Sequence, residues 1–199
     1  MTRFAVIRHG PTEWNAIGRV QGRSDIALSA AGRETVSGWS VPPQLAGFHR
    51  IASPLARAAE TAEILFGEHV ASDDRLIEMN WAEWEGLSLK SLRAELGDLM
   101  VAWEARGLDF RAPGGESPRD VQVRLAPLLA EVAAAGTPAV AVTHKGVIRA
   151  LYALATGWDM TDKPRDKLRD DCAHLFSLSP QGIPMVDRLN VAMVSGGTP

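Results

Sequence analysis

The chain begins with the stretch Phe4-Ala5-Val6-Ile7-Arg8-His9-Gly10, and a second stretch of similar plan follows at Ala139-Val140-Ala141-Val142-Thr143-His144-Lys145-Gly146. In both stretches a short apolar run leads within two residues to a histidine and then to a glycine. Short continuous apolar runs bounded by turn residues indicate strands that are buried on both faces. The two stretches therefore predict two buried strands, each followed by a histidine.

Helical patterns separate these strands. We expect helices over residues 29–39, 55–66, 117–135 and 147–155, a further short strand over residues 50–52, and a terminal hairpin from residues 175–178 and 185–189. Ser117 and Pro118 are typical of a helix start, and Gly136 is typical of a helix end. Buried strands that alternate with helices predict an α/β fold of three layers, with a mainly parallel sheet covered by helices on both faces.

Residues 81–116 form the least regular part of the chain. Short helices are expected over residues 88–96 and 99–106, before the turn-rich stretch Ala112-Pro113-Gly114-Gly115. The 199 residues are enough for one sizeable core and contain no evident linker or repeat. We therefore expect one domain, residues 1–199, in which the segment 81–116 is an insertion that caps the substrate.

Composition and charge exclude several classes of protein. The chain contains 21 Lys and Arg residues and 24 Asp and Glu residues, so its net charge is -3. It has no cluster of basic residues in the sequence, which argues against nucleic acid as a partner. No stretch approaches the roughly 18 apolar residues of a membrane span, and the first ten residues lack the apolar centre of a secretory signal. The single cysteine, Cys172, has no CxxC partner for a zinc site. We expect a cytoplasmic protein without a membrane partner, as a monomer or a homodimer.

The candidate site lies where three predicted strands end. The first strand leads to Arg8 and His9, the strand over residues 50–52 leads to Ser53 and then Arg57, and the strand over residues 139–143 leads to His144. Ligands of parallel α/β sheets bind beside the carboxyl ends of the strands. A lone histidine is more often structural than catalytic, but two histidines and two arginines at one sheet edge point to a site.

These residue types suit phosphoryl chemistry. Arginine presents a planar, permanently charged fork to phosphate oxygens, and a neutral histidine can act as a nucleophile toward phosphorus. Nearby cations and a helix amino terminus disfavour the imidazolium form, so we expect a neutral ring near pH 7. Phosphoryl transfer depends mainly on positioning and charge neutralisation, so the site needs no metal and no other cofactor. A metal site is the weaker alternative, because the two guanidinium groups repel a cation.

The stretch Arg8-His9-Gly10-Pro11-Thr12-Glu13-Trp14-Asn15 and five ordered motifs after it carry a family resemblance. The five are Gln21-Gly22 with Asp25 and Leu28-Ser29, Ser53-Pro54-Leu55-Ala56-Arg57-Ala58 with Thr61-Ala62, Leu76-Ile77-Glu78 before Trp84-Glu85-Gly86, Pro113-Gly114-Gly115-Glu116-Ser117, and Val142-Thr143-His144 with Gly146-Val147. Together they resemble the histidine phosphatase superfamily, with its phosphoglycerate-mutase-like fold, over nearly the whole chain. The compact layout is similar to the small-phosphatase branch that includes α-ribazole phosphatase and broad-specificity phosphatases.

The resemblance implies a role for each matching residue. His9 corresponds to the nucleophile that becomes phosphohistidine. Arg8, Arg57 and His144 correspond to residues that bind the phosphoryl group. Glu78 corresponds to the acid that protonates the leaving oxygen, with Glu83 as the alternative if the alignment shifts. Further phosphate contacts are implied for Asn15 and Gly22, and Thr12 lines the same turn.

Two positions depart from the family pattern. Ala82 stands where glycine is usual, and Lys145 stands where a glycine commonly follows the second histidine. Lys145 either contacts phosphate or projects into solvent.

The resemblance implies phosphomonoester hydrolysis of a small phosphorylated metabolite. Phosphoglycerate mutase-type transfer is the first alternative, although mutases typically carry a longer added segment than the roughly thirty residues between Glu85 and Ser117. A catalytically silent phosphate-binding module is the second, because a fold does not fix a function.

Overall fold

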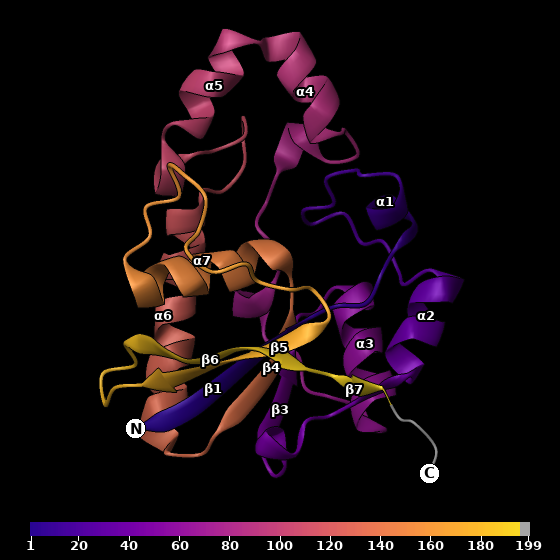
Figure 1. Ribbon diagram of the computed structural model, residues 1–199, viewed down its shortest axis with the longest axis vertical. Coiled ribbons are helices and arrows are strands. Elements are labelled where there is room, and N and C mark those ends of the chain that lie inside the picture. Colours follow the sequence, from indigo (N-terminus) through magenta and orange to yellow (C-terminus); the bar gives the residue numbers. More distant parts are fainter. Residues whose placement is uncertain (196–199) are drawn as a thin grey trace.

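The computed structural model describes residues 1–195, and its central feature is a five-stranded sheet with the strand order β3-β4-β1-β5-β6 (Figure 1). The strands are β1 (Thr2–Arg8), β3 (His49–Ala52), β4 (Ala139–Thr143), β5 (Cys172–Leu178) and β6 (Pro184–Ala192). β1 and β3 both run parallel to β4, whereas β5 and β6 are antiparallel to their neighbours. The three predicted buried strands and the terminal hairpin are confirmed.

Helices cover both faces of the sheet, as the sequence predicts (Figure 1). The alternation along β1 shows this directly: Phe4 and Val6 belong to one apolar cluster, and Ala5 and Ile7 belong to another. The first cluster is completed by α6 (Pro118–Ala135) and α7 (Lys145–Thr156). The second is completed by α3 (Ala56–Phe66), beside which lies α2 (Ala30–Ser37). The fold is the predicted three-layer α/β arrangement.

Local sequence signals account for the ends of α6. The Ser117 side chain accepts a hydrogen bond from the backbone of Asp120, and the Asp120 carboxylate accepts one from the Ser117 backbone, so the two form a capping box. Pro118 occupies the first helical position, where its missing N–H costs nothing. Gly136 ends the helix in the left-handed conformation.

Three details differ from the expected elements. α2 ends at Ser37 rather than Trp39, and Trp39 belongs to the short strand β2 (Trp39–Ser40), which pairs with β7 (Val194–Ser195). The four-residue helix α1 (Glu13–Ala16) follows the first histidine motif and was not expected. α7 begins at Lys145, directly after His144, rather than at residue 147.

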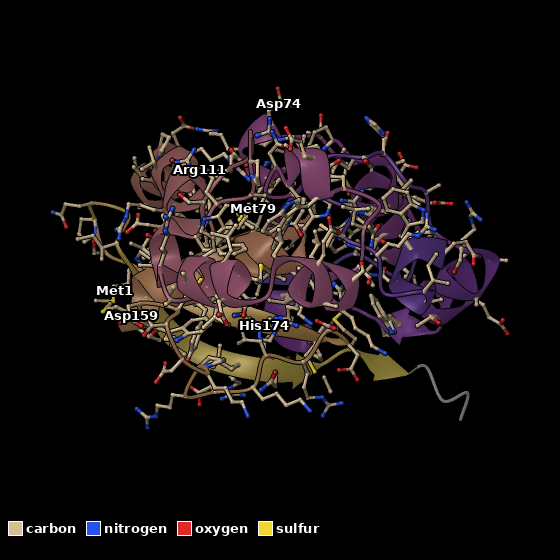
Figure 2. All side chains as sticks on the ribbon, turned by 90° about the horizontal axis from the view of Figure 1, so that it is seen from above. Met1, Asp74, Met79, Arg111, Asp159 and His174 are labelled. Carbon is tan, nitrogen blue, oxygen red and sulfur yellow. The ribbon has the colours of Figure 1, made fainter. Side chains whose placement is uncertain are left out.

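The segment 81–116 forms a lobe above the sheet edge at which β1 and β4 end (Figure 1). It contains α4 (Leu89–Leu96) and α5 (Asp98–Glu104), and its core is a separate apolar cluster that includes Trp84, Leu92 and Met100. Trp81 packs against both this cluster and the cluster under α6 and α7. Figure 2 looks down onto the lobe, with β5 and β6 along one side of the molecule. Among residues 1–195, no helix is long and apolar enough to cross a membrane.

Candidate active site

The three parallel strands deliver the predicted residues to one place. The His9 N–H donates to the Thr143 carbonyl at 2.9 Å, and the Ser53 N–H donates to the Val142 carbonyl at 2.9 Å. These bonds extend the β1, β4 and β3 ladders by one residue and therefore fix where the following side chains begin. The structure brings these strand ends together as predicted, since the His9 and His144 ring centroids lie 5.1 Å apart and the Ser53 hydroxyl lies 2.7 Å from His144 Nε2.

His9 is held by its own backbone turn. Its Nδ1 lies 2.7 Å from the Gly10 carbonyl oxygen, and a carbonyl can only accept a hydrogen bond. Nδ1 is therefore the protonated nitrogen, and the neutral ring carries its lone pair on Nε2. The His9 and His144 ring centroids are 5.1 Å apart, and the rings are tilted by 55°. The histidine after β1 thus keeps a nucleophilic nitrogen beside the second ring.

His144 is held differently. Its Nε2 lies 2.7 Å from the Ser53 hydroxyl, which can donate or accept. Its Nδ1 has no hydrogen-bond partner among the described residues. The side chain is completely buried at the start of α7.

Arg57 and Arg8 are held by different kinds of partner, backbone carbonyls for Arg57 and a carboxylate for Arg8. Arg57 is completely buried, and its two terminal nitrogens donate to the Ser24 carbonyl at 2.9 Å and the Gly22 carbonyl at 2.7 Å. Arg8 forms an ion pair with Asp170, with 2.5 Å between Nη1 and Oδ2. Both guanidinium groups are therefore oriented by contacts at their outer nitrogens.

The unpartnered polar atoms mark the site most sharply. Within the described residues, the buried side-chain nitrogens and oxygens without a hydrogen-bond partner are Nε of Arg8, Nε of Arg57 and Nδ1 of His144. Leaving a buried donor unsatisfied costs about 1–3 kcal/mol, so such atoms are rare unless a ligand uses them. All three belong to the residues that the sequence assigns to phosphoryl binding.

Electrostatics keep both rings neutral. Burial is the main cause that lowers the pKa of His9 well below its ordinary value, and the charges of Arg8 and Arg57 lower it further. Burial also lowers the pKa of His144, followed by His9 and the same two arginines. Both shifts favour the neutral ring, as expected, with desolvation as the larger cause and the cations as the second.

Glu78 is the buried carboxyl of the site. Its Oε1 accepts from the Met79 N–H at 2.8 Å, and its Oε2 accepts from the Gly146 N–H at 3.1 Å, in the first turn of α7. Those two bonds and Arg57 favour the carboxylate, yet burial outweighs them and raises the pKa of Glu78. A Cβ at residue 146 would lie 2.4 Å from Oε1, so glycine is required there for the carboxyl to approach the helix.

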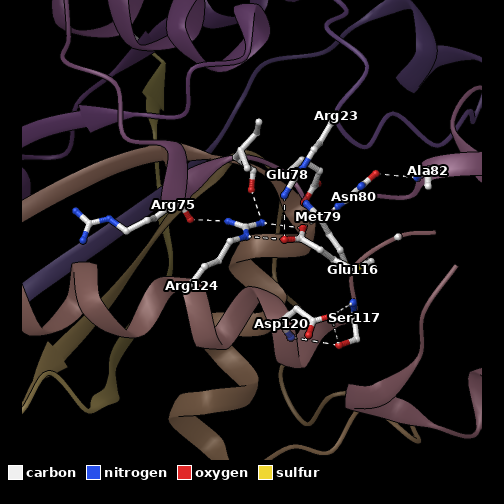
Figure 3. Close-up of polar contacts among 12 residues, drawn as sticks. Arg23, Arg75, Glu78, Met79, Asn80, Ala82, Glu116, Ser117, Asp120 and Arg124 are labelled. Carbon is white, nitrogen blue, oxygen red and sulfur yellow. Dashed lines mark hydrogen bonds and ion pairs between the residues drawn. The ribbon is translucent and has the colours of Figure 1, made fainter. Parts of the chain in front are cut away.

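Charged side chains form hydrogen bonds with the backbone of the segment that carries Glu78 and hold it in place (Figure 3). Arg124, on α6, donates to the Arg75 carbonyl at 2.5 Å and to the Ile77 carbonyl at 2.6 Å. The Glu116 carboxylate accepts from Arg124 at 3.2 Å and from the Asn80 N–H at 2.9 Å. The Pro-Gly-Gly-Glu-Ser motif therefore supports the candidate acid, a role that the sequence analysis missed.

Gly22 has the same kind of requirement as Gly146. It adopts φ +53°, and a Cβ there would lie 2.0 Å from the Glu85 carboxylate. Glu85 accepts from the N–H groups of Arg23 and Ser24, each at 2.8 Å. This carboxylate shapes the loop whose carbonyls hold Arg57, a role that the motif alone does not show.

Asn15 and Thr12 form the cap of α1. The Thr12 N–H and hydroxyl both donate to the Asn15 carboxamide oxygen, at 3.0 and 3.1 Å, so the amide NH2 group is the part of Asn15 that remains for a ligand. Thr12 is buried, and its hydroxyl also lies 3.0 Å from Gln21 Oε1. Thr12 thus lines the turn, as expected, and engages Asn15 and Gln21.

The structure also places the alternative acid, Glu83, and the two positions that depart from the family pattern, Ala82 and Lys145. Glu83 is exposed in the 3-10 helix Ala82–Trp84, unlike the buried Glu78. Ala82 keeps a backbone φ of +42°, the region that favours glycine, so the turn retains the glycine-like conformation at a steric cost. Lys145 is exposed and pairs at 3.3 Å with Asp170, the carboxylate that also pairs with Arg8.

Comparison with known families agrees with this geometry. The model of the histidine phosphatase superfamily (branch 1) matches residues 4–191. The chain belongs to this superfamily. Together with the phosphatases among its relatives, this assignment confirms the family, fold and enzyme class implied by the motifs: the protein is a hydrolase of the histidine phosphatase family.

Individual relatives of this histidine phosphatase include phosphatases of known structure. It is 36% identical to the glucosyl-3-phosphoglycerate phosphatase of Mycolicibacterium vanbaalenii over 177 residues, which are 81% of this chain and 77% of that protein. A mycobacterial glucosyl-3-phosphoglycerate phosphatase complexed with VO3 superposes with a TM-score of 0.80 at 27% identity, covering 96% of this chain and all of the other. A phosphoserine phosphatase from Entamoeba histolytica with 3-phosphoglyceric acid gives 0.78 at 26% identity, over 96% and 98% of the two chains.

Proposed function

We propose that this chain hydrolyses phosphomonoesters of small metabolites through a phosphohistidine on His9. The observation that carries the proposal is the set of three buried, unpartnered N–H or ring-nitrogen atoms of Arg8, Arg57 and His144 around a ring whose Nε2 carries a lone pair. A phosphoryl group supplies the oxygens that these atoms lack, and His9 attacks its phosphorus.

In the first step, His9 Nε2 forms a bond to phosphorus while the ester P–O bond breaks. Arg8, Arg57 and His144 hold the three equatorial oxygens, and Asn15 and the Gly22 N–H contribute further donors. His144 donates from Nδ1 in the tautomer in which Ser53 donates to Nε2. The carbonyl contact of His9 likewise keeps the proton on Nδ1 and leaves the lone pair on Nε2, the nitrogen that attacks phosphorus.

Glu78 acts as the general acid in the first step and as the general base in the second. Its protonated carboxyl gives the proton to the leaving oxygen, and its carboxylate then takes one from the water that attacks phosphohistidine. The second step breaks the P–N bond, releases inorganic phosphate and returns His9 to its neutral form. The raised pKa of Glu78 supports this role over the exposed Glu83.

Mutase-type transfer and a silent binding module are the competing functions. The short segment between Glu85 and Ser117 favours hydrolysis over transfer, because transfer requires the phosphohistidine to be shielded from water. The presence of His9, Glu78 and His144 in one buried group favours catalysis over binding alone. We further infer a cytoplasmic enzyme that acts without a metal, as a monomer or homodimer, and without nucleic acid or membrane partners.

Turnover of p-nitrophenyl phosphate tests the reaction. Phosphate release that persists in EDTA is expected, and absence of release from any phosphomonoester would favour the binding module. With 3-phosphoglycerate and a bisphosphate primer, phosphate release should exceed isomer formation, and faster isomerisation would favour the mutase.

Trapping tests the mechanism. An alkaline quench during turnover of a 32P-labelled substrate should retain label on the protein, and acid should remove it. The label should disappear in His9→Ala and remain in His69→Ala, which changes an exposed histidine outside the site. Label that persists in His9→Ala would assign the nucleophile elsewhere.

A further inference from the structure

A second cationic feature adjoins the phosphoryl site. A cavity of about 200 Å³ lies between α7 and the chain segment that leads into β5, and five of its lining residues are cationic. They are Arg8, Lys145, Arg149, Lys167 and Arg169. We call this space the basic cavity. It shares Arg8 with the phosphoryl site, since Arg8 lines the cavity and also directly precedes His9.

The carboxylates nearby leave two of these cations unpaired. Asp170 is the acidic residue that lines the basic cavity, and it pairs with Arg8 and Lys145. Arg169 pairs with Asp171. Arg149 and Lys167 form no ion pair within the described part of the chain. The Arg149 guanidinium lies over the Trp158 ring at 4.8 Å, and burial lowers its pKa.

The wall that carries Lys167 is held in place by hydrogen bonds from the sheet. Asn190, on β6, donates to the Lys167 carbonyl at 2.9 Å and accepts from the Arg169 N–H at 2.8 Å. His174, on β5, lies with Nε2 3.1 Å from the Arg169 carbonyl, and its Nδ1 accepts from the Asn190 N–H at 3.3 Å. Figure 2 places His174 on the side of the molecule where β5 and β6 lie. The cavity wall is therefore built by the fold rather than by a loose loop.

The lining chemistry defines the ligand. Ile148, Pro164 and Leu168 give the basic cavity an apolar part, and the unpaired cations supply charge. Ligand sites commonly combine apolar walls with a few charged groups that fix orientation. Such a space suits a short carbon chain or ring that ends in a carboxylate or phosphate.

We propose that the basic cavity binds a second anionic group of the substrate, so that this enzyme prefers phosphomonoesters whose leaving group is itself negatively charged. The proposal rests on the proposed function, because it needs the phosphoryl group of the same molecule to lie against His9. Arg149 and Lys167 are the specificity-determining residues. Asp170 already pairs with Arg8 and Lys145, so Arg149 and Lys167 are the cations left for the anion.

Matched substrates test the proposal. One pair is 3-phosphoglycerate and glycerol 3-phosphate, which differ by a carboxylate in place of a hydroxymethyl group. The other pair is 4-carboxyphenyl phosphate and 4-carbamoylphenyl phosphate, which have the same shape and differ in charge. The measured quantity is the ratio of kcat/KM within each pair. The wild-type enzyme should favour the charged member of at least one pair.

Variants connect that preference to the cavity. Lys167→Met and Arg149→Met should each lower the ratio about tenfold, the effect of one charge-assisted contact. Arg149→Lys should restore most of it, which separates charge from packing on Trp158. Lys163→Met is the matched control, since it removes a charge from the same segment outside the cavity lining, and its ratio should equal the wild-type ratio.

The outcomes are distinct. Equal kcat/KM within both pairs in the wild-type enzyme overturns the basic cavity proposal while the proposed function stands. A preference that survives in both Lys167→Met and Arg149→Met overturns it as well. If none of the four esters is hydrolysed while p-nitrophenyl phosphate is, the basic cavity proposal is overturned and the proposed function stands; if p-nitrophenyl phosphate is not hydrolysed either, the proposed function itself fails.

Discussion

The ends of β1 and β4 carry the same residue type into the same site, yet they hold it in opposite ways. His9 follows β1 and is bound at Nδ1 by the Gly10 carbonyl, whereas His144 follows β4 and is bound at Nε2 by the Ser53 hydroxyl. Both rings are buried, and burial lowers both pKa values. Burial alone therefore does not distinguish a nucleophile from a phosphate-binding residue.

The partner of the bound nitrogen makes the distinction. A carbonyl accepts only, so it fixes one tautomer of His9 and leaves a lone pair on Nε2. A hydroxyl does either, so His144 can present a proton at Nδ1. The backbone after each strand also differs, because β4 leads directly into α7 while β1 leads into a loop and the short α1. The expected similarity of the two motifs thus ends at their histidines.

The largest effect should come from His9. Replacement by alanine removes the atom that bonds to phosphorus, and kcat should fall by roughly 10⁴-fold. Stopped-time phosphate assays on the wild-type enzyme and His69→Ala provide the reference. A variant that retains more than a few per cent of wild-type activity would contradict the division of roles between the two strand ends.

His144→Ala should be less severe. It removes one donor to the transferred oxygens, a loss of roughly 10²–10³ in kcat. Because the nucleophile remains, acid-labile label should still form on the protein, only more slowly. Complete loss of label together with a normal circular dichroism spectrum would instead make His144 the nucleophile.

Glu78→Gln should reduce hydrolysis of alkyl phosphates by about 10² and of p-nitrophenyl phosphate much less, because the nitrophenolate leaves without a proton. Its pH profile tests the same assignment. The pKa of Glu78 is raised, so the acid persists above its ordinary range, and activity on alkyl esters is lost as pH rises through that value.

The loss of activity at the acid end of the same pH profile is expected to come from protonation of His9. Because the pKa of His9 is lowered, its ring stays neutral at pH values below the ordinary pKa of histidine. Activity is therefore lost only as pH falls through the lowered pKa. Glu78→Gln should therefore abolish the alkaline limb and keep the acid limb. An alkaline limb that is unchanged in Glu78→Gln and absent in Glu83→Gln would transfer the role of acid to Glu83.

Gly146→Ala tests how the end of β4 positions the acid. The added Cβ would lie 2.4 Å from Glu78 Oε1, so the carboxyl must move, and kcat on alkyl esters should fall about tenfold. Gly38→Ala is the control, because its added Cβ meets nothing closer than 3.5 Å. Equal activity of the two variants would show that the carboxyl does not need this approach.

The smallest effect is expected from Ser53→Ala. It removes the hydroxyl partner of His144 and should lower kcat about threefold to tenfold, the value of one neutral hydrogen bond. The informative measurement is 15N NMR of His144, whose tautomer populations should change while those of His9 do not. A shift at both rings would mean that the two partners are not independent.

The sequence predicts the strands well because their signals are local. Each buried run and its turn residues lie within a few positions of one another, and the rule for parallel sheets then places Arg57 near His9 across nearly fifty residues. The β2 and β7 pairing was not predictable in this way. It joins Trp39–Ser40 to Val194–Ser195 over a short contact without a local sequence signal. For the same reason the helix that was expected to extend to Trp39 ends earlier, at Ser37.

The supporting residues of the site were harder to predict than the candidate catalytic ones. Glu85, Glu116 and Arg124 act through backbone atoms that lie far away in the sequence, such as the Ile77 carbonyl that accepts from Arg124. An alignment to motifs names Glu85 and Glu116 without saying what they hold, and it does not name Arg124. The pairing of Lys145 with Asp170 likewise depends on a segment whose path the sequence does not specify.

The two apolar clusters that share Trp81 have a consequence for local stability. The lobe of α4 and α5 has its own small core around Trp84, Leu92 and Met100, apart from the cluster under α6 and α7. Native proteins open in such units, each with its own free energy. Backbone amides of the lobe should therefore exchange with deuterium faster than those of β1 and β4, so that the cover over the strand ends can fluctuate while the histidines keep their places.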